Sequence, residues 1–351
     1  MASKVSASTP RIGAHAEVAV VHLARFGNGE STLNAFLASY TQHAAGATHD
    51  LVVLLKGYAD KPDAERTAQT ILRAYNARTL TITDDGLDLD AYREAIGAFD
   101  YSYYCFVNSF SRFTATNWLR HMLEAAKRPG VGIVGATGSF QSVSSDELIA
   151  LRSQVQRIPR KILTLLSRTE RSREVDRRGS EGRRLASPTT VSAETRHPIA
   201  RILHALKYAS RRLSIAGSAI LHYAFFPNAH IRTNAFLLPR DVLARITWPK
   251  VESKRNAYYF ESGRSGLTTQ IVGLGLEPIV VGRDGRQYVR REWPSSRTFW
   301  HGNQENLLIQ DNQTTQYQRG SDDERRRLCR HAWRDLARSA PGPAASSGSS
   351  N

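Results

Sequence analysis

Between Glu17 and Phe140, short apolar runs alternate with longer segments whose apolar residues recur at helical spacing. The apolar runs predict strands at residues 18–23, 50–55, 79–83, 103–107 and 132–135. The segments between them predict helices at residues 31–41, 63–77, 90–98 and 114–127, with N-caps at Ser31, Asp63 and Thr114. This alternation is typical of a mostly parallel sheet covered by helices, so we expect an α/β fold whose chemistry gathers at the carboxyl ends of the strands.

Composition narrows the partners of such a fold. The 351 residues are enough for a large buried core, and 48 Lys and Arg against 32 Asp and Glu give a net charge of +16. This charge favours an anionic partner, whether phosphate groups, nucleic acid or acidic lipid. The two cysteines, Cys105 and Cys329, have no metal-binding spacing and favour a reducing compartment. No signal peptide or membrane-spanning run is visible, so we expect a cytoplasmic protein.

Residues 151–215 differ in kind from the rest of the chain. Sixteen Lys and Arg against five Asp and Glu give this stretch a net charge of +11. Its middle, residues 168–195, is rich in Arg and Ser and predicts a flexible loop, whereas apolar residues recur at helical spacing on either side. Basic amphipathic helices suit an anionic membrane surface. A helical pair packed on the core, with a solvated basic face, is the alternative.

Two polar segments follow predicted strands. Residues 84–92 (DDGLDLDAY) place four carboxylates after the third strand, where they suit ribose or sugar hydroxyls, although a helix start would look similar. Asp88 is the candidate that we favour among them. Residues 106–112 (FVNSFSR) bring short polar groups and one cation to the sheet edge, where a diphosphate would fit, with a plain polar turn as the alternative.

Later segments add a second set of candidates. Glu261 lies between aromatic residues and a Gly-Arg pair, which suits a general base, and Arg264 would hold a phosphate or orient the acid. A structural Arg–Glu pair is the alternative. Segments dense in amides and aromatics contain the candidate acceptor or phosphate contacts His230, Asn234, His301 and Asp311. His301 is also the candidate metal ligand, and each histidine has a structural role as its alternative.

In this order the segments resemble bacterial glycosyltransferases of the GT-A type, particularly polysaccharide-cluster enzymes related to the rhamnan-synthesis group. The resemblance runs from about Ala16 to Tyr317. It comprises a polar loop after the first strand, the acidic glycine turn, a strand ending at the position of a DxD motif, and an ED-type motif at Glu261-Ser262. At the DxD position this chain has residues 108–111, Asn-Ser-Phe-Ser, without a carboxylate.

The resemblance implies a GT-A-like fold with a nucleotide-sugar donor at the carboxyl edge of the N-terminal sheet. The implied donor contacts are Arg25, Asp88, Asn108, Ser109, Ser111 and Arg112. Glu261 would deprotonate the acceptor hydroxyl in a one-step inverting displacement. A divalent metal, Mg²⁺ or Mn²⁺, would be held through Asn108 and His301, or a cation such as Arg112 or Arg264 would take its place.

The chain then divides into six expected segments. They are a disordered N-terminus (1–15), a nucleotide-sugar-binding α/β half (16–150), a basic helical insertion (151–227), an acceptor-side and catalytic half (228–318), a charged helix (319–340) and a disordered tail (341–351).

We therefore expect a glycosyltransferase, hexosyltransferase-like, that glycosylates a hydroxyl of a cell-surface polysaccharide or lipid-linked glycan. Residues 151–215 would bind it peripherally to the anionic inner membrane. A non-catalytic sugar-binding or scaffold protein on the same fold is one alternative. A basic nucleic-acid-binding protein is another, but the sequence offers no zinc finger, RRM motif or helix-turn-helix, so no nucleic-acid partner is expected.

Overall fold

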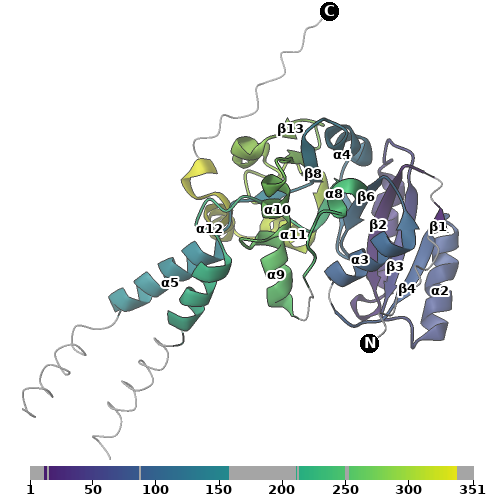
Figure 1. The fold of residues 1–351 in the computed structure, drawn as a ribbon, viewed down its shortest axis with the longest axis horizontal. Helices are drawn as coiled ribbons and strands as arrows, with labels where there is room; N and C mark the ends of the chain where they lie inside the picture. The colour runs from purple at the N-terminus through teal and green to yellow at the C-terminus, as the bar shows by residue number, and fades with distance from the viewer. Residues whose placement is uncertain are drawn as a thin grey trace, which may run out of the picture. The chain divides into compact units, whose positions relative to one another are not determined.

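The computed structural model describes residues 12–13, 16–86, 88–157, 211, 213–249 and 253–337 (Figure 1). Most of the expected disordered N-terminus, the expected tail and most of the expected basic insertion lie outside these residues, but residues 12–13 form a short strand rather than a disordered end. The chain divides into two compact units, one formed by Met1–Ser142 with Phe226–Asn351 and the other by Val143–Phe225.

An eight-stranded sheet organises the first unit, in the order β13-β12-β8-β11-β6-β2-β3-β4. Its strands are β2 (Val18–Arg25), β3 (Asp50–Lys56), β4 (Arg78–Ile82), β6 (Tyr103–Val107), β8 (Val131–Gly135), β11 (Ala235–Pro239), β12 (Glu277–Val281) and β13 (Gln287–Tyr288). Strands β4, β3, β2 and β6 run parallel, β11 is antiparallel to β6 and β8, and β12 is parallel to β8. This mostly parallel sheet, flanked by helices, confirms the expected α/β class.

The strand order reverses at β2. From β2 the chain moves outward through β3 and β4, and it then returns to place β6 on the other side of β2. The register pairs His22 of β2 with Val107 of β6, so the residues that follow both strands reach the same edge of the sheet. Such a reversal leaves a crevice at the carboxyl ends of the two strands, where α/β sheets bind their ligands.

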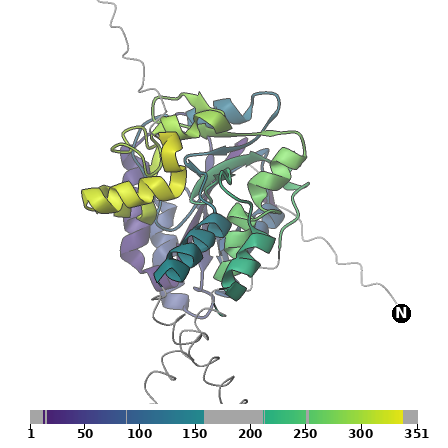
Figure 2. The same cartoon turned by 90° about the vertical axis from the view of Figure 1, so that its left-hand side faces the viewer.

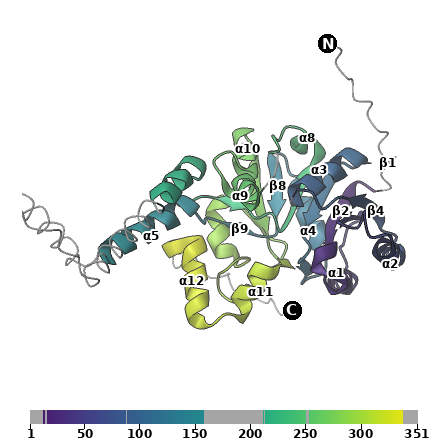
Figure 3. The ribbon, with the colours of Figure 1, turned by 90° about the horizontal axis from the view of Figure 1, so that it is seen from below.

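Helices cover both faces of the sheet. The helices α1 (Glu30–Gln42), α2 (Pro62–Arg73) and α4 (Trp118–Ala126) contribute to one buried apolar cluster, and α3 (Asp88–Ala98), α8 (Arg240–Leu243) and α10 (Leu267–Gly273) contribute to another. Figure 3 shows α1 and α2 on one side of the strands and α3, α8 and α10 on the other. Because interior strands such as β2 are covered on both faces, they are almost continuously apolar.

All four expected helices of the N-terminal half are present, but the three expected N-caps are wrong. The cap positions are taken by Gly29, Lys61 and Asn117. Pro62 fits the first position of α2 because its missing N–H would have no partner there. Thr114 does not cap α4, since its hydroxyl donates to the carbonyl oxygens of Leu307 and Leu308 at 2.6 and 3.0 Å.

Short elements complete the first unit. They are β1 (Ile12–Gly13), β5 (Phe99–Asp100), β7 (Arg112–Phe113), β9 (Gly138–Ser139), β10 (His230–Ile231), β14 (Ile309–Gln310), α9 (Lys254–Ser262), α11 (Asn312–Arg319), α12 (Asp322–Trp333) and the 3-10 helices η1 (Phe26–Asn28), η3 (Arg290–Ser296) and η4 (Arg334–Ala337). Figure 2 shows α12 leading into η4, both in yellow. Antiparallel pairs join β9 to β10 and β7 to β14, which ties the C-terminal half to the N-terminal half.

The second unit contains α5 (Val143–Arg157) and a helical stretch at residues 213–222. The two lie side by side in Figures 1 and 2, and the Ser144 hydroxyl donates to the carbonyl oxygens of Ala219 and Tyr223 at 2.7 and 2.9 Å. Exposed large apolar side chains in this unit include Ile149, Leu213, Leu221 and Phe225. Across the described parts of the chain, none of the helices combines the length and apolarity needed to cross a membrane.

Candidate functional site

A cavity of about 330 Å³ opens at the carboxyl ends of β2 and β6, where the strand order reverses. We call its two sides the strand wall and the loop wall. The strand wall includes Arg25, Asp88, Tyr92, Asn108 and Ser109. The loop wall comes from much later in the chain and includes Arg232, Thr233, Asn234, Glu261, Asp311 and Gln313.

Arg25, the last residue of β2, forms a bidentate ion pair with Asp84. Its Nε and Nη2 donate to Oδ1 and Oδ2 of Asp84, both at 2.9 Å. These bonds raise the pKa of Arg25 and lower that of Asp84. Lys56, the buried last residue of β3, donates to the carbonyl oxygens of Asp85 and Gly86 at 2.9 and 3.1 Å. The acidic turn is therefore anchored to the ends of two neighbouring strands.

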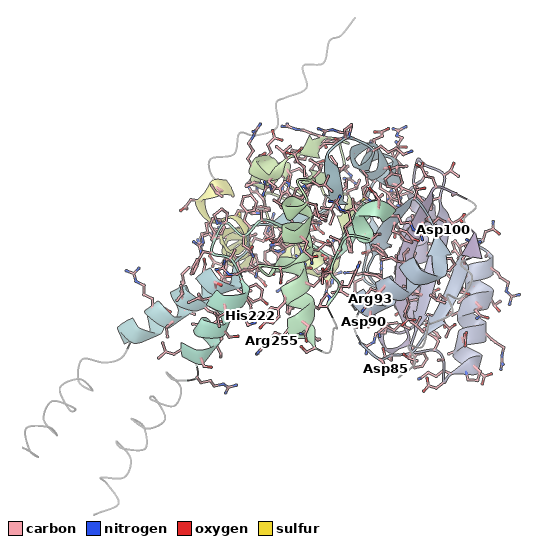
Figure 4. All side chains as sticks on the ribbon, viewed as in Figure 1. Asp85, Asp90, Arg93, Asp100, His222 and Arg255 are labelled. Carbon is pink, nitrogen blue, oxygen red and sulfur yellow. The ribbon has the colours of Figure 1, made fainter. Side chains whose placement is uncertain are left out.

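Gly86 allows this turn to lead into α3. Its φ is +72°, a region that disfavours side chains, and a Cβ there would lie 2.4 Å from Oδ2 of Asp90. Figure 4 labels Asp85 on the turn and Asp90 and Arg93 on α3. The glycine thus permits the close approach that brings Asp88, the first residue of α3, to the cavity.

Asp88 and Tyr92 lie one helical turn apart on α3 and both line the strand wall. Desolvation by the surrounding protein atoms raises the pKa of Asp88, although the residue is exposed at the surface. The charges of Lys56 and Arg25 oppose this effect. Tyr92 is buried, and its hydroxyl has no hydrogen-bond partner within the described residues. Burial, reinforced by the charge of Asp88, raises the pKa of Tyr92 well above its usual value.

The DxD position is occupied by a turn whose acceptor atoms are already engaged. Oδ1 of Asn108 accepts hydrogen bonds from the backbone N–H of Phe110 and from the Ser111 hydroxyl, both at 3.0 Å. The Ser109 hydroxyl donates to the carbonyl oxygen of Leu23 at 2.7 Å and so joins the end of β6 to β2. The Asn108 amide therefore has only its donor, Nδ2, left to bind a ligand.

Glu261, near the end of α9, is a partly buried carboxylate of the loop wall. Its Oε2 accepts from the backbone N–H of Thr233 at 2.9 Å and also from the Thr233 hydroxyl. Burial acts to raise the pKa of Glu261, but the charges of Arg232 and His230 and the bonds from Thr233 lower it overall. Glu261 is therefore ionised at neutral pH, and its Oε1 accepts no hydrogen bond from the described residues.

Arg232 is a buried cation of the same wall, only 6% exposed. Its Nη1 donates to Oε1 of Gln313 at 2.6 Å, and its Nη2 lies 3.9 Å from Oδ2 of Asp311. The guanidinium carbon lies 4.3 Å from the centroid of the Phe299 ring. Asp311 is itself held as the N-cap of α11, where its Oδ1 accepts from the backbone N–H of Thr314 at 2.8 Å. These contacts fix Arg232 in one position.

The structure brings many of the candidates from the sequence to this cavity. Those that line it are Arg25, Asp88, Asn108, Ser109, Asn234, Glu261 and Asp311. Those that do not line it are Ser111, Arg112, His230, Arg264 and His301.

The candidates outside the cavity are used in local structure. Ser111 is fully buried, and its hydroxyl also lies 3.1 Å from the Asn234 carbonyl oxygen. Arg112 donates to the carbonyl oxygen of Ser111 at 2.7 Å. Nδ1 of His230 donates to the carbonyl oxygen of Asn228 at 2.8 Å, and burial lowers the pKa of His230 despite the nearby charge of Glu261. His301 bonds the carbonyl oxygen of Pro294 through Nδ1 at 2.6 Å.

Sequence reasoning missed Arg232 and Tyr92. Arg232 lies between His230 and Asn234, in a segment already singled out, and a lone cation just before a buried strand was the available signal. Tyr92 had no such signal because its position on α3 reads as ordinary core. The alternative reading of Glu261, a structural pair with Arg264, is also not what the structure has, since Glu261 interacts with Arg232 and Thr233.

The cavity does not fit a resident divalent cation. Among the described residues, no group of three or more His, Cys, Asp or Glu side chains is placed to hold a metal ion. Oδ1 of Asn108 already accepts two hydrogen bonds, and a buried guanidinium lines the same cavity. Oxygen ligands with free lone pairs, which Mg²⁺ and Mn²⁺ require, are therefore not offered at the DxD position.

No family model matches the sequence, and no curated protein matches it. Solved structures that resemble parts of the fold include a mannosyltransferase from Pyrobaculum calidifontis, solved with GDP-mannose and Mn²⁺ (12% identity, TM-score 0.28, covering 36% of this chain and 36% of that chain). Another is glucosyl-3-phosphoglycerate synthase from Mycobacterium tuberculosis, solved with UDP and Mn²⁺ (17% identity, TM-score 0.28, 41% and 52%). A third is 4-diphosphocytidyl-2C-methyl-D-erythritol synthase from Anaerococcus prevotii (14%, 0.27, 35% and 55%). The chain thus spans about a third to just over half of each solved chain, and similarity at this level identifies no ligand.

Proposed function

We propose that this protein is a glycosyltransferase that moves a sugar from a nucleotide-sugar donor to a hydroxyl of a cell-surface polysaccharide or lipid-linked glycan. The observation that carries the proposal is Glu261, a partly buried and ionised carboxylate fixed by Thr233 in the wall of a cavity at the reversal point of an α/β sheet. A base with one free oxygen beside a nucleotide-type crevice is the arrangement that glycosyl transfer needs.

The strand wall suits the donor. Arg25 offers a cation and Asp88 an acceptor for ribose or base hydrogen bonds, while Asn108 and Ser109 lie at the strand end where the diphosphate would rest. The part of the loop wall around Glu261 suits the acceptor sugar because its amide and carboxylate groups match sugar hydroxyls. Rigid positioning of donor and acceptor would supply much of the rate.

Glu261 acts as the base of a one-step inverting displacement. Its Oε1 takes the proton of the acceptor hydroxyl as that oxygen attacks the anomeric carbon. The bond from this carbon to the donor phosphate oxygen breaks, and the nucleotide leaves with the electron pair. Because the pKa of Glu261 is lowered, the proton moves only as the hydroxyl becomes acidic in the transition state.

The test is turnover of UDP-, GDP-, CMP- and dTDP-sugars, followed by nucleotide release. We expect one donor class to be used, and we expect Glu261→Gln to lower turnover by about 10²- to 10⁴-fold while donor affinity stays within about twofold. Glu277→Gln, at an exposed carboxylate that opens β12, is the matched control and should leave turnover unchanged. Donor binding with unchanged turnover in Glu261→Gln would favour a non-catalytic sugar-binding protein.

We further propose that the second unit docks on an anionic membrane, where a lipid-linked acceptor resides. Its exposed apolar side chains, Leu221 and Phe225 among them, lie in a unit that includes the whole +11 stretch at residues 151–215. Sedimentation with phosphatidylglycerol vesicles, but not phosphatidylcholine vesicles, is expected. Leu221→Asp with Phe225→Asp should abolish it, whereas Leu336→Asp, at an exposed leucine of the first unit, should not. Unchanged sedimentation of the double variant would refute docking.

A further inference from the structure

Nitrogen donors in the cavity wall lack acceptors. Nε of Arg232 and Nδ2 of Asn234 are buried and have no hydrogen-bond partner in the part of the chain that the structure describes. Nδ2 of Asn108 has no acceptor among the same residues either. Leaving a buried donor unpaired is unfavourable, so a ligand that supplies acceptor oxygens is favoured here.

The acceptor atoms of the same side chains are already used. Oδ1 of Asn234 accepts from the Thr137 hydroxyl at 2.8 Å, and Oδ1 of Asn108 accepts from Phe110 and Ser111. Both amides therefore keep their N–H groups for the cavity. Donors without free acceptors select an anion and disfavour a metal ion.

We infer that Arg232, Asn234 and Asn108 bind the diphosphate of the donor, and that the fixed charge of Arg232 replaces the divalent cation of metal-dependent transfer. This inference rests on the proposed function. When the anomeric carbon–oxygen bond breaks, the electron pair stays on the phosphate oxygen, and Arg232 with the two amides stabilises the new negative charge. Because Gln313 and Asp311 already hold the guanidinium, little reorganisation is needed at that moment.

The two loop-wall carboxylates of the cavity are each engaged through at least one oxygen. Oε2 of Glu261 is engaged by Thr233, and Asp311 is engaged by Thr314 and lies close to Arg232. The Tyr92 hydroxyl, also buried and unpartnered among the described residues, adds a further donor on the strand wall.

The test is calorimetric binding of inorganic pyrophosphate to the full chain in EDTA. We expect measurable binding without metal, and we expect Arg232→Gln to weaken it at least tenfold. Arg128→Gln removes an exposed cation that bonds Gln287 outside the cavity, and it should leave the affinity within about twofold. Circular dichroism spectra of both variants establish that each is folded.

A second variant keeps the inference falsifiable if Arg232→Gln does not fold. Asn108→Asp restores a carboxylate at the DxD position, so it should weaken pyrophosphate binding in EDTA at least fivefold, and Mn²⁺ should restore the affinity. Pyrophosphate binding by the native chain only with Mn²⁺ or Mg²⁺ present, or equal affinity in Arg232→Gln, would overturn the inference. Arg232-dependent pyrophosphate binding without any nucleotide-sugar binding would instead overturn the proposed function alone.

Discussion

The strand wall and the loop wall of the cavity are built in different ways. Strand-wall side chains such as Arg25 and Asn108 lie at or just after the ends of neighbouring parallel strands, so the sheet alone brings them together. Loop-wall side chains such as Arg232, Glu261 and Asp311 come from three short elements, and they are held by hydrogen bonds and charges between those elements. The topology thus fixes where the cavity lies, and contacts distant in sequence fix its charges.

The largest effect on stability is expected in the loop wall. Asp311→Ala removes the N-cap of α11, worth about 1 kcal/mol, and it removes the carboxylate nearest to the buried Arg232, so we expect a loss of about 2–3 kcal/mol. Asp311→Asn keeps an oxygen for Thr314 and should lose about 1 kcal/mol less. Urea unfolding measures both. Equal losses in the two variants would show that the cap contributes nothing.

The strand that ends at Arg25, β2, carries a buried acid-sensitive residue, His22, behind the strand wall. Burial, with a smaller effect of the Arg112 charge, lowers the pKa of His22 to about 3. The unfolded chain takes up this proton below pH 6.5, whereas the folded chain does so only near pH 3. The folded chain therefore has its full stability above about pH 6.5 and loses stability as the pH falls, by about 2 kcal/mol at pH 5.

A phenylalanine at position 22 tests this dependence, because it keeps a ring stacked on Phe36, whose centroid lies 3.5 Å from that of the imidazole. Between pH 7 and 5, His22→Phe should lose about 2 kcal/mol less stability in urea unfolding than the native chain. His222→Gln, at an exposed position, is the control and should follow the native chain. Parallel pH curves for His22→Phe and the native chain would contradict the prediction.

Local sequence patterns account for the position of the strand wall, whereas the loop wall depends on contacts between distant segments. The apolar runs of β2, β4 and β6 are local signals, and the residues at or after their ends place Arg25, Asp88 and Asn108 at one edge without any knowledge of distant contacts. Such local signals do not determine which cation reaches the diphosphate. Arg112 and Arg264 were the expected cations, and neither residue lines the cavity. Arg232 is held in the cavity wall by Gln313 and Asp311, which lie about eighty residues later in the chain, and no local sequence pattern predicts such a pairing.

The turn before α3 tests how strongly the strand wall depends on a single backbone position, Gly86. Gly86→Ala places a side chain at a φ of +72° and against Asp90, so we expect a loss of about 1–2 kcal/mol and a severalfold weaker donor affinity. Gly97→Ala is the control: it lies within α3, nothing lies within 4 Å of its Cβ, and it should stabilise by up to about 1 kcal/mol. Unfolding and donor titration of both variants decide the point. Unchanged donor affinity in Gly86→Ala would separate the turn from the site.

The smallest effect on stability is expected at the rim. The side chains of Arg25 and Asp84 are 46% and 47% exposed, so Arg25→Gln should cost less than about 1 kcal/mol of stability while weakening donor binding severalfold. Lys127→Gln breaks the comparably exposed pair with Glu17 outside the cavity and should leave donor binding unchanged. Equal donor affinities in the two variants would remove Arg25 from the site.

The most direct measurement of the central claim, that this cavity binds a nucleotide-sugar donor, is a thermal-shift panel of UDP-, GDP-, CMP- and dTDP-sugars, each in EDTA and in Mn²⁺. We predict stabilisation by donors of one nucleotide base, by about 2.7 kcal/mol at one hundred times the dissociation constant, in EDTA as well as in Mn²⁺. Arg232→Gln should lose that stabilisation. If no nucleotide sugar stabilises the protein under either condition, the cavity is not a donor site and the proposed function is wrong.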